Sequence, residues 1–266
     1  MSRSDTSTRA VRLDDLVGRA RRPVVLTGAG FSVASGLPTY RGPEGLWTID
    51  PEAEALGGPP PPDAPDVEVR SFWDRSWSHW GPMREVAGRA GPNAGHRALS
   101  AWQDAVPGLV VVTQNVDGLD TRAGTRDVRE IHGTLWRDRC SDPGCAQPPW
   151  PDDEPRTTAP PCPTCGRPGR LDAVMFTEPL DPLVFHLVKR AVKDADLLVV
   201  MGTSGSVSPA SDLPWLASDY GVPCVRVDPG RWLGRQIPWA LEVTAPAEGV
   251  LPPAISPLTT GGAGPA

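Results

Sequence analysis

Two pairs of cysteines are the clearest chemical feature of the sequence. They are Cys140-x4-Cys145 and Cys162-x2-Cys165, and each pair encloses a proline. Cysteines at such spacing are typical of a structural zinc site with four thiolate ligands, which leaves no open position for catalysis. The first pair is two residues longer than the usual Cys-x2-Cys, so free surface thiols remain the alternative. The fifth cysteine, Cys224, lies in an apolar run and is expected to be a buried thiol.

A glycine-rich turn follows the first apolar run of the chain. In Gly28-Ala29-Gly30, glycines would let a pyrophosphate approach exposed backbone N–H groups at the start of a helix. Val33 stands where the dinucleotide fingerprint has its third glycine. On its own, this turn is therefore equally compatible with a plain connection between a strand and a helix.

Polar side chains that could do chemistry follow two other predicted strands. Gln114, Asn115 and Asp117 are residue types that favour turns, but their side chains can also pair a carboxamide or hold a ribose. His132 is a candidate general base near pH 7. Without further context, a single histidine is more often a packing or turn residue than a catalytic one.

The elements that position these turns alternate between strands and helices. Buried parallel strands are predicted at four apolar runs, Pro23–Thr27, Leu109–Thr113, Leu197–Met201 and Cys224–Val227, and a further strand at Asp127–Ile131. Helices are predicted at Val11–Arg21, Asn93–Asp104 and Asp181–Asp194. This order predicts an α/β fold with a doubly wound, Rossmann-like parallel sheet. Ligands bind such sheets beyond the carboxyl ends of the strands, where the polar turns would meet.

Charge and composition exclude several classes of function. The 266 residues carry a net charge of −6, with a pI near 5.3, which argues against a basic nucleic-acid surface. No apolar run approaches the roughly 18 residues of a membrane helix, so no membrane partner is expected. The polar N-terminus lacks the apolar core of a signal peptide. A cytoplasmic location is therefore expected, where cysteines are metal ligands or free thiols rather than disulfides.

The polar turns belong to longer strings that resemble one known family. The first, GAGFSVASGLPTYRG from Gly28, resembles the sirtuin signature GAG-x-S-x-x-SGIPDFR. TQNVDG from Thr113, EIHG from Glu130 and GTSGSVSPASDLP from Gly202 resemble three further sirtuin elements. All four strings occur in the family's order, with the cysteine pairs in the expected place between them. The chain is thus similar to sirtuins of the bacterial type, which are NAD-dependent protein-lysine deacylases.

The resemblance implies a reaction and its catalytic residues. NAD would be the cosubstrate, zinc would be structural, and proteins with acylated lysines would be the partners. The acyl oxygen attacks the ribose carbon as nicotinamide leaves, and the products are the free lysine and O-acyl-ADP-ribose. His132 would activate a ribose hydroxyl, while Asn115 would hold ribose and ordered water. Asp117 and nearby backbone groups would pair the carboxamide of nicotinamide.

The resemblance also implies which residues bind the two substrates. Those expected to bind the cofactor are Gly28, Ala29, Gly30, Ser32, Tyr40, Arg41, Gln114, Asn115, Asp117, Gly202, Thr203, Ser204 and Asp228. Val174 and Phe176 would line the tunnel for the acyl-lysine. The carboxylate of Asp228 would disfavour a 2′-phosphate, so NAD is expected to be preferred over NADP.

The chain departs from the family's pattern at a few positions. Thr39 stands where the family has Asp, Asp120 where a His is common, and Thr177 where it has Gly. Thr177 leaves the geometry of the bound peptide open, because the family's substrate pairs as a strand beside that loop. Tyr40 replaces the usual Phe, and Asp228 the usual Asn. None of the expected catalytic groups is lost.

The chain is expected to divide into a large domain with two inserted modules. The expected parts are flexible tails at 1–10 and 251–266, a Rossmann-like NAD-binding domain at 11–45, 91–135 and 172–250, a helical and linker module at 46–90, and a zinc-ribbon module at 136–171.

Two alternatives to deacylation stay open at this point. One is an enzyme of the same fold that cleaves NAD or transfers ADP-ribose, and the other is a non-catalytic module that binds NAD and zinc. For a deacylase, short neutral acyl groups such as acetyl are expected rather than succinyl or malonyl. Sirtuins that take acidic acyl groups share a Tyr-x-x-Arg pair in the helical module, which this chain lacks. Arg70, Arg75 or Arg84 could in principle replace that pair.

Overall fold

The computed structural model describes residues 12–40, 45, 59–61, 63–175 and 178–260. A large parallel sheet holds six strands in the order β3-β2-β1-β7-β8-β9. The strands are β1 (Pro23–Thr27), β2 (Val110–Thr113), β3 (Val128–Glu130), β7 (Leu197–Met201), β8 (Cys224–Val227) and β9 (Leu241–Val243). Every neighbouring pair is parallel. The doubly wound fold is confirmed, and only the edge strand β9 was not predicted.

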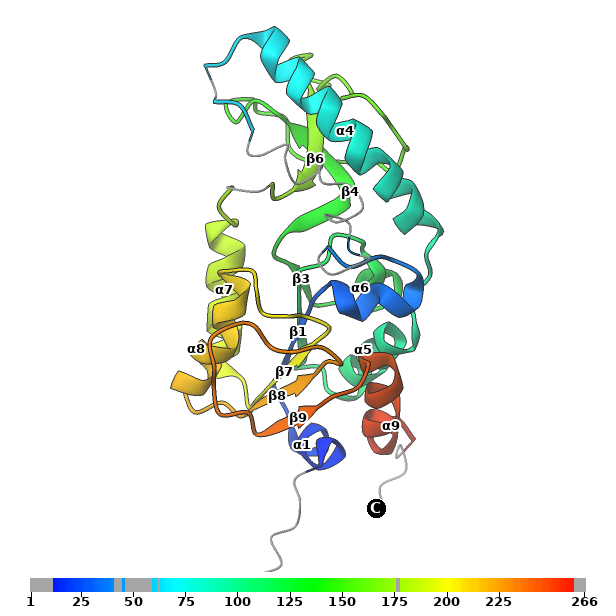
Figure 1. The fold of residues 1–266 in the computed structure, drawn as a ribbon, viewed down its shortest axis with the longest axis vertical. Coiled ribbons are helices and arrows are strands. Elements are labelled where there is room, and N and C mark those ends of the chain that lie inside the picture. The colour runs from blue at the N-terminus through cyan, green and yellow to red at the C-terminus, as the bar shows by residue number, and fades with distance from the viewer. Residues whose placement is uncertain (1–11, 41–44, 46–58, 62, 176–177, 261–266) are drawn as a thin grey trace, which may run out of the picture.

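Helices cover both faces of this sheet (Figure 1). On one face, α1 (Leu13–Arg19), α5 (Ala94–Ala105) and α9 (Ala247–Thr260) pack against alternate strand residues such as Val25 and Val199. On the other face, α7 (Pro182–Asp194) and α8 (Leu213–Asp219) pack against Leu26 and Val200. Burial on both faces explains why the strands read as continuous apolar runs. Cys224 is one of these buried residues, and burial raises the pKa of its thiol to about 12.

Short polar sequences fix where the helices begin. Asp181 accepts hydrogen bonds from the N–H groups of Leu183 and Val184, and Pro182 occupies the first turn of α7, as predicted. Asn93 caps α5 in the same way, and His96 Nδ1 accepts a hydrogen bond from the Asn93 N–H. Burial lowers the pKa of His96 to about 4, so this histidine is neutral and structural. A 3₁₀ helix of seven residues follows β1 (Ala29–Ser35), and one of three residues precedes α8 (Ala210–Asp212). The helix α6 spans Leu119–Arg122.

A smaller module lies above the large sheet (Figure 1). Its antiparallel sheet places β4 (Gly133–Cys140) between β5 (Trp150–Pro151) and β6 (Gly169–Ala173). The long helix α4 (Asp66–Arg89) packs against it through the buried Trp73 and Trp77. Trp77 Nε1 donates to the Gly169 carbonyl at 2.9 Å, so the indole has a partner inside this core. A Cβ at Gly81 would lie 1.6 Å from the Arg156 carbonyl, so only glycine allows this close approach.

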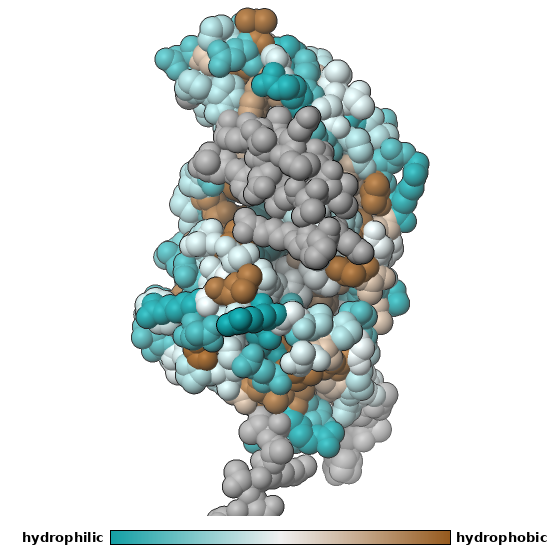
Figure 2. Space-filling view, in the orientation of Figure 1, coloured by the Kyte–Doolittle hydropathy of each residue, from teal (hydrophilic) through white to brown (hydrophobic). Residues whose placement is uncertain are grey.

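The expected C-terminal tail at 251–266 is wrong for residues 251–260. These residues form most of α9, and Leu251, Ala254 and Ile255 are buried against the large sheet. Their spacing is helical, and the burial of this stripe outweighs the helix-breaking tendency of three prolines. Residues 261–266, the expected tail at 1–10, and residues 46–58 and 62 of the expected helical and linker module lie outside the described residues. None of the described helices is long and apolar enough to cross a membrane. On the face in Figure 2, hydrophobic residues form small separate patches on a mostly hydrophilic surface.

Candidate active site

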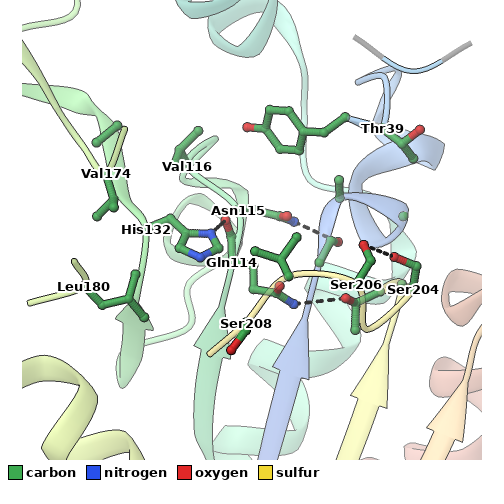
Figure 3. A pocket seen from close by; sticks show the side chains of 18 of the residues that line it. Thr39, Gln114, Asn115, Val116, His132, Val174, Leu180, Ser204, Ser206 and Ser208 are labelled. Atoms are coloured by element: carbon green, nitrogen blue, oxygen red, sulfur yellow. Dashed lines mark hydrogen bonds between the residues drawn. The ribbon is translucent and has the colours of Figure 1, made fainter. Parts of the chain in front are cut away.

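A cavity of about 1090 Å³ opens at the carboxyl ends of the central strands, where the large sheet faces the smaller module (Figure 3). Its wall includes most of the residues singled out from the sequence, namely Gly28, Ala29, Gly30, Tyr40, Gln114, Asn115, His132, Val174, Gly202, Thr203, Ser204 and Asp228. Ser32 and Asp117 lie directly behind Asn115, as described below. Arg41 and Phe176, together with Thr177, lie outside the described residues.

The glycine turn lies in close contact with the turn that follows β7. The Gly30 N–H donates to the Gly202 carbonyl at 2.9 Å. A Cβ at Gly28 would come within 2.8 Å of that same carbonyl, and one at Gly202 within 2.2 Å of the Phe31 nitrogen. Gly202 also has a φ of +61°, which other residues rarely adopt. These glycines therefore let the two loops meet at the carboxyl ends of β1 and β7, and phosphate binding by this turn stays a prediction.

Asn115 is held rigidly, with one acceptor left over. Its Nδ2 donates to the Gly28 carbonyl at 3.1 Å and to Ser32 Oγ at 3.2 Å. The side chain is buried, yet Oδ1 has no hydrogen-bond partner among the described residues. A buried acceptor without a partner is costly unless a ligand or a water supplies the donor. Asn115 thus presents a fixed oxygen that fits a ribose hydroxyl or an ordered water.

Asp117 holds Ser32, which is one of the two partners of the Asn115 amide. Its Oδ2 accepts from Ser32 Oγ at 2.7 Å, and its Oδ1 accepts from the Leu119 N–H at 2.9 Å. Burial raises the pKa of Asp117, while the two hydrogen bonds favour the charged form. The same carboxylate adds to the effect of burial in raising the pKa of the Tyr40 phenol. Ser32 and Asp117 therefore form a polar pair behind Asn115, with Tyr40 nearby.

His132 is held by one hydrogen bond that fixes its tautomer. Its Nδ1 lies 2.9 Å from the Gln114 carbonyl oxygen, which only accepts hydrogen bonds, so Nδ1 carries the proton and Nε2 is left as an acceptor. Burial lowers the pKa of His132, partly offset by the hydrogen bond to Gln114. The His132 carbonyl also accepts from the Val174 N–H at 2.9 Å, which joins the base to the segment expected to hold the acyl-lysine.

Asp120 belongs to a buried network that sequence reasoning noted only as a departure. Burial, and then the nearby Asp117, raises the pKa of Asp120 to about 7. Asp120 is bonded to Thr113, whose Oγ1 accepts from Thr27 Oγ1 at 2.9 Å and from the Asn115 N–H at 3.1 Å. Asp120 therefore supports the backbone of Asn115 through Thr113 and does not line the cavity.

The turns after β7 and β8 line another part of the cavity. Gln114 Nε2 donates to Thr203 Oγ1 at 3.1 Å, and Ser204 Oγ lies 3.0 Å from Ser206 Oγ (Figure 3). Asp228 Oδ1 accepts from the Gly230 N–H at 2.6 Å and lies 3.4 Å from the buried Arg226 guanidinium. These polar side chains suit the hydroxyls of a ribose, and the site includes serines at 206 and 208 that sequence reasoning did not name.

The four cysteines meet at one point of the smaller module. Their sulfur atoms all lie within 4.8 Å of one another, and none forms a disulfide. Tetrahedral Zn–S bonds of about 2.3 Å place sulfurs roughly 3.8 Å apart, so the cluster fits zinc. The longer first loop is folded back, because Asp142 Oδ1 accepts from the Gly144 N–H at 2.9 Å and the Asp142 carbonyl from the Cys145 N–H at 3.1 Å. The two extra residues are therefore absorbed by a turn.

Comparison with known proteins gives a consistent picture. The Sir2 family model matches residues 28–209. An NAD-dependent protein deacylase of Corynebacterium glutamicum is 42% identical over 228 residues, which cover 82% of this chain and 84% of the relative. A solved Sir2 homolog–NAD complex superposes with a TM-score of 0.79 at 29% identity, covering 94% of this chain and 93% of the other. A Sir2 mutant bound to 2′-O-acetyl-ADP-ribose superposes equally well, at 29% identity and 94% and 96% coverage.

Proposed function

The chain belongs to the Sir2 family, and we propose that it removes acetyl and other short neutral acyl groups from protein lysines with NAD as cosubstrate. One observation carries this proposal. His132, whose Nε2 is left as the acceptor, and Asn115, whose buried Oδ1 has no partner among the described residues, line one cavity together with the glycine turn. A pyrophosphate, a ribose and an acyl-lysine all find matching groups there.

Each residue has a defined part in the proposed reaction. NAD, when bound, supplies the ribose carbon that accepts the acyl oxygen as nicotinamide leaves. His132 Nε2 accepts the proton of a ribose hydroxyl, and its Nδ1–H is held by the Gln114 carbonyl throughout. Asn115 Oδ1 accepts from a ribose hydroxyl or a water. Asp117 remains the residue proposed to pair the carboxamide of nicotinamide, although in this structure its carboxylate lies behind Asn115 and is bonded to Ser32 and Leu119. Val174 and Phe176 remain the residues proposed to line the lysine tunnel.

The substrates, the other partners and the location are also proposals. Proteins with acylated lysines are the proposed substrates, and solved relatives include a Sir2–p53 peptide–NAD complex at 25% identity with a TM-score of 0.66, covering 91% of this chain and 95% of the other. The net charge of −6 supports the expectation that nucleic acid is not a partner. A cytoplasmic location remains a proposal. Asp228, which lines the cavity, supports the choice of NAD over NADP.

Nicotinamide release tests the proposal against its alternatives. With NAD and an acetyl-lysine peptide, nicotinamide should appear at the same rate as the free-lysine peptide. The unmodified peptide should give almost none. Equal release with and without the acyl group would favour an NAD-cleaving or ADP-ribosyl-transferring enzyme. Absence of turnover in every case would favour a non-catalytic module.

The acid limb of the pH profile should report His132. The base must be neutral, so activity is present above its pKa and is lost as the pH falls through it. Because burial lowers this pKa from 6.5, kcat/KM should reach half of its plateau below pH 6.5. The measurement is kcat/KM for acetyl-lysine peptide between about pH 5 and 8. Asp120→Asn removes a nearby carboxyl group whose pKa is raised to about 7, so the acid limb should persist in that variant. A midpoint above 7 in both proteins would contradict the assignment.

Acidic acyl groups should be poor substrates. The three arginines that could have paired a carboxylate have other partners. Arg84 is fully buried and bound to Asp138 and Asp152, Arg70 donates to the Ala159 carbonyl, and Arg75 donates to Ser71. An acyl carboxylate buried without a cation is strongly disfavoured. On one peptide, kcat/KM for acetyl-lysine should therefore exceed that for succinyl-lysine by at least about tenfold. A succinyl value that equals or exceeds the acetyl value would refute this expectation.

A further inference from the structure

One buried cation in the large sheet has no role in the residue assignments above. Arg226 interrupts the apolar run of β8, and only 3% of its surface is exposed. Its neighbour in β7 is Val200, and the other residues of β8 are buried in the hydrophobic core. A guanidinium in such a place is costly unless carboxylates compensate for the water that it loses. The contacts of Arg226 therefore indicate what it stabilises.

The guanidinium lies between two carboxylates. Nη2 is 3.4 Å from Asp228 Oδ1 and also donates to the Gly230 carbonyl. Nη1 is 3.5 Å from Oε2 of Glu242, the residue that pairs with Arg226 across β8 and β9. The side chain of Glu242 is 50% exposed, whereas that of Asp228 is only 12% exposed. Water can therefore hydrate Glu242, but Asp228 depends on partners within the protein.

Asp228 is the cavity residue that this cation contacts. Asp228 lines the cavity, whereas Arg226 does not. Its Oδ1 accepts from the Gly230 N–H at 2.6 Å, and the carboxylate also accepts from the Thr203 N–H. These bonds join the turn after β8 to the turn after β7. The carboxylate is thus fixed in the part of the cavity whose polar side chains suit the hydroxyls of a ribose.

The charges around Asp228 make Arg226 its main cationic partner. Residues 202–209 after β7 carry no charged side chain, and the other surrounding elements contribute Arg231, Arg235, Glu242 and Glu248. Burial raises the pKa of Asp228, whereas the Gly230 N–H, the Arg226 guanidinium and the Thr203 N–H lower it. Arg226 therefore favours the charged form of a carboxylate that burial alone would disfavour.

We propose that Arg226 is a positioning residue for the cosubstrate, which holds the Asp228 carboxylate charged and directed at the ribose hydroxyls of NAD. This inference rests on the proposed function. A carboxylate accepts stronger hydrogen bonds from hydroxyls than a neutral carboxyl group does. Without the guanidinium, the pKa of Asp228 should rise, so the carboxylate takes up a proton at a higher pH than in the wild type. The affinity for a ribose should then fall as the pH falls.

Binding of ADP-ribose tests the inference without turnover. The Kd is measured by calorimetry between about pH 6 and 9 for the wild type, Arg226→Met, Asp228→Asn and the double variant. The ratio of the Kd of Arg226→Met to that of the wild type should be close to unity at the alkaline end and should rise to at least about fivefold at the acid end. In the Asp228→Asn background, Arg226→Met should change the Kd less than about twofold at every pH, because the group through which it acts is absent.

Glu242→Gln is the matched control, because it removes the other carboxylate partner of the same guanidinium and does not line the cavity. Its Kd should follow that of the wild type at every pH. Arg226→Lys keeps a cation and should restore part of the affinity that Arg226→Met loses at the acid end. If Arg226→Met does not fold, Arg226→Gln, which is polar but uncharged, serves in the same comparison.

Two results would overturn the inference. Equal weakening of binding by Arg226→Met with Asp or Asn at position 228 would show that the arginine acts without the carboxylate. A ratio of Kd values that does not vary with pH would show that the charge of Asp228 is not what Arg226 maintains. A wild type that does not bind ADP-ribose would instead contradict the proposed function, and with it this inference.

Discussion

Replacement of His132 by Ala should lower kcat for deacylation by roughly 10²–10⁴-fold, the usual effect of removing a positioned base. The reason is the tautomer that the structure fixes, in which the Gln114 carbonyl holds Nδ1–H and leaves Nε2 as the acceptor. No other described histidine lines the cavity, so no second imidazole can replace it. The loss should be measured in single turnover with acetyl-lysine peptide, where product release does not limit the rate.

The control is His186→Ala, because His186 is an exposed histidine on α7 outside the cavity wall. This variant should retain wild-type activity. NAD should bind His132→Ala with little change in Kd, since the glycine turn and Asn115 are intact. Near wild-type turnover of His132→Ala would remove His132 from the mechanism.

Loss of zinc should have the second large effect. Cys162→Ser removes one of four clustered ligands, and metal binding to such a site contributes on the order of 10 kcal/mol to folding. The module should then loosen, which limited proteolysis between β4 and β6 would detect. Activity should fall as well, because β4 begins at Gly133, directly after His132, and Val174 directly follows β6.

Metal analysis gives the matching measurement. Gently purified protein should hold one zinc per chain, and Cys162→Ser should hold much less. Cys224→Ala is the control, because that cysteine is buried in the large domain away from the cluster and its loss should not change the zinc content. Full activity in protein with substoichiometric zinc would count against the proposed structural role.

Much of the large sheet could be read from local sequence. The strands β1, β7 and β8 have the predicted bounds, because each is a short apolar run ended by a polar turn and buried on both faces. The polar turns converge for the same reason, since parallel strands bring their carboxyl ends to one edge. The edge strand β9 spans only Leu241–Val243, which is too short for a recognisable pattern.

Other features depend on tertiary packing and had no local signal. In α9, the shortage of large apolar residues indicated a tail, but the docking of Leu251 and Ile255 on the large sheet decides the outcome. In α4, Trp73 and Trp80 look alike in sequence. Only the packed structure shows that Trp73 is buried in the core of the smaller module, whereas Trp80 lines the cavity. The network behind Asn115 likewise requires the pairing of β1 with β2, which brings Thr27 beside Thr113.

The most direct test of the account is the fate of the acyl group. Wild-type protein is mixed with NAD and a peptide whose acetyl-lysine carries an isotopic label in the acetyl group, and the products are weighed by mass spectrometry. The account predicts equal amounts of free-lysine peptide, nicotinamide and ADP-ribose that carries the labelled acetyl group. Labelled acetate released without NAD consumption, or ADP-ribose formed without the label while the peptide stays acetylated, would contradict it.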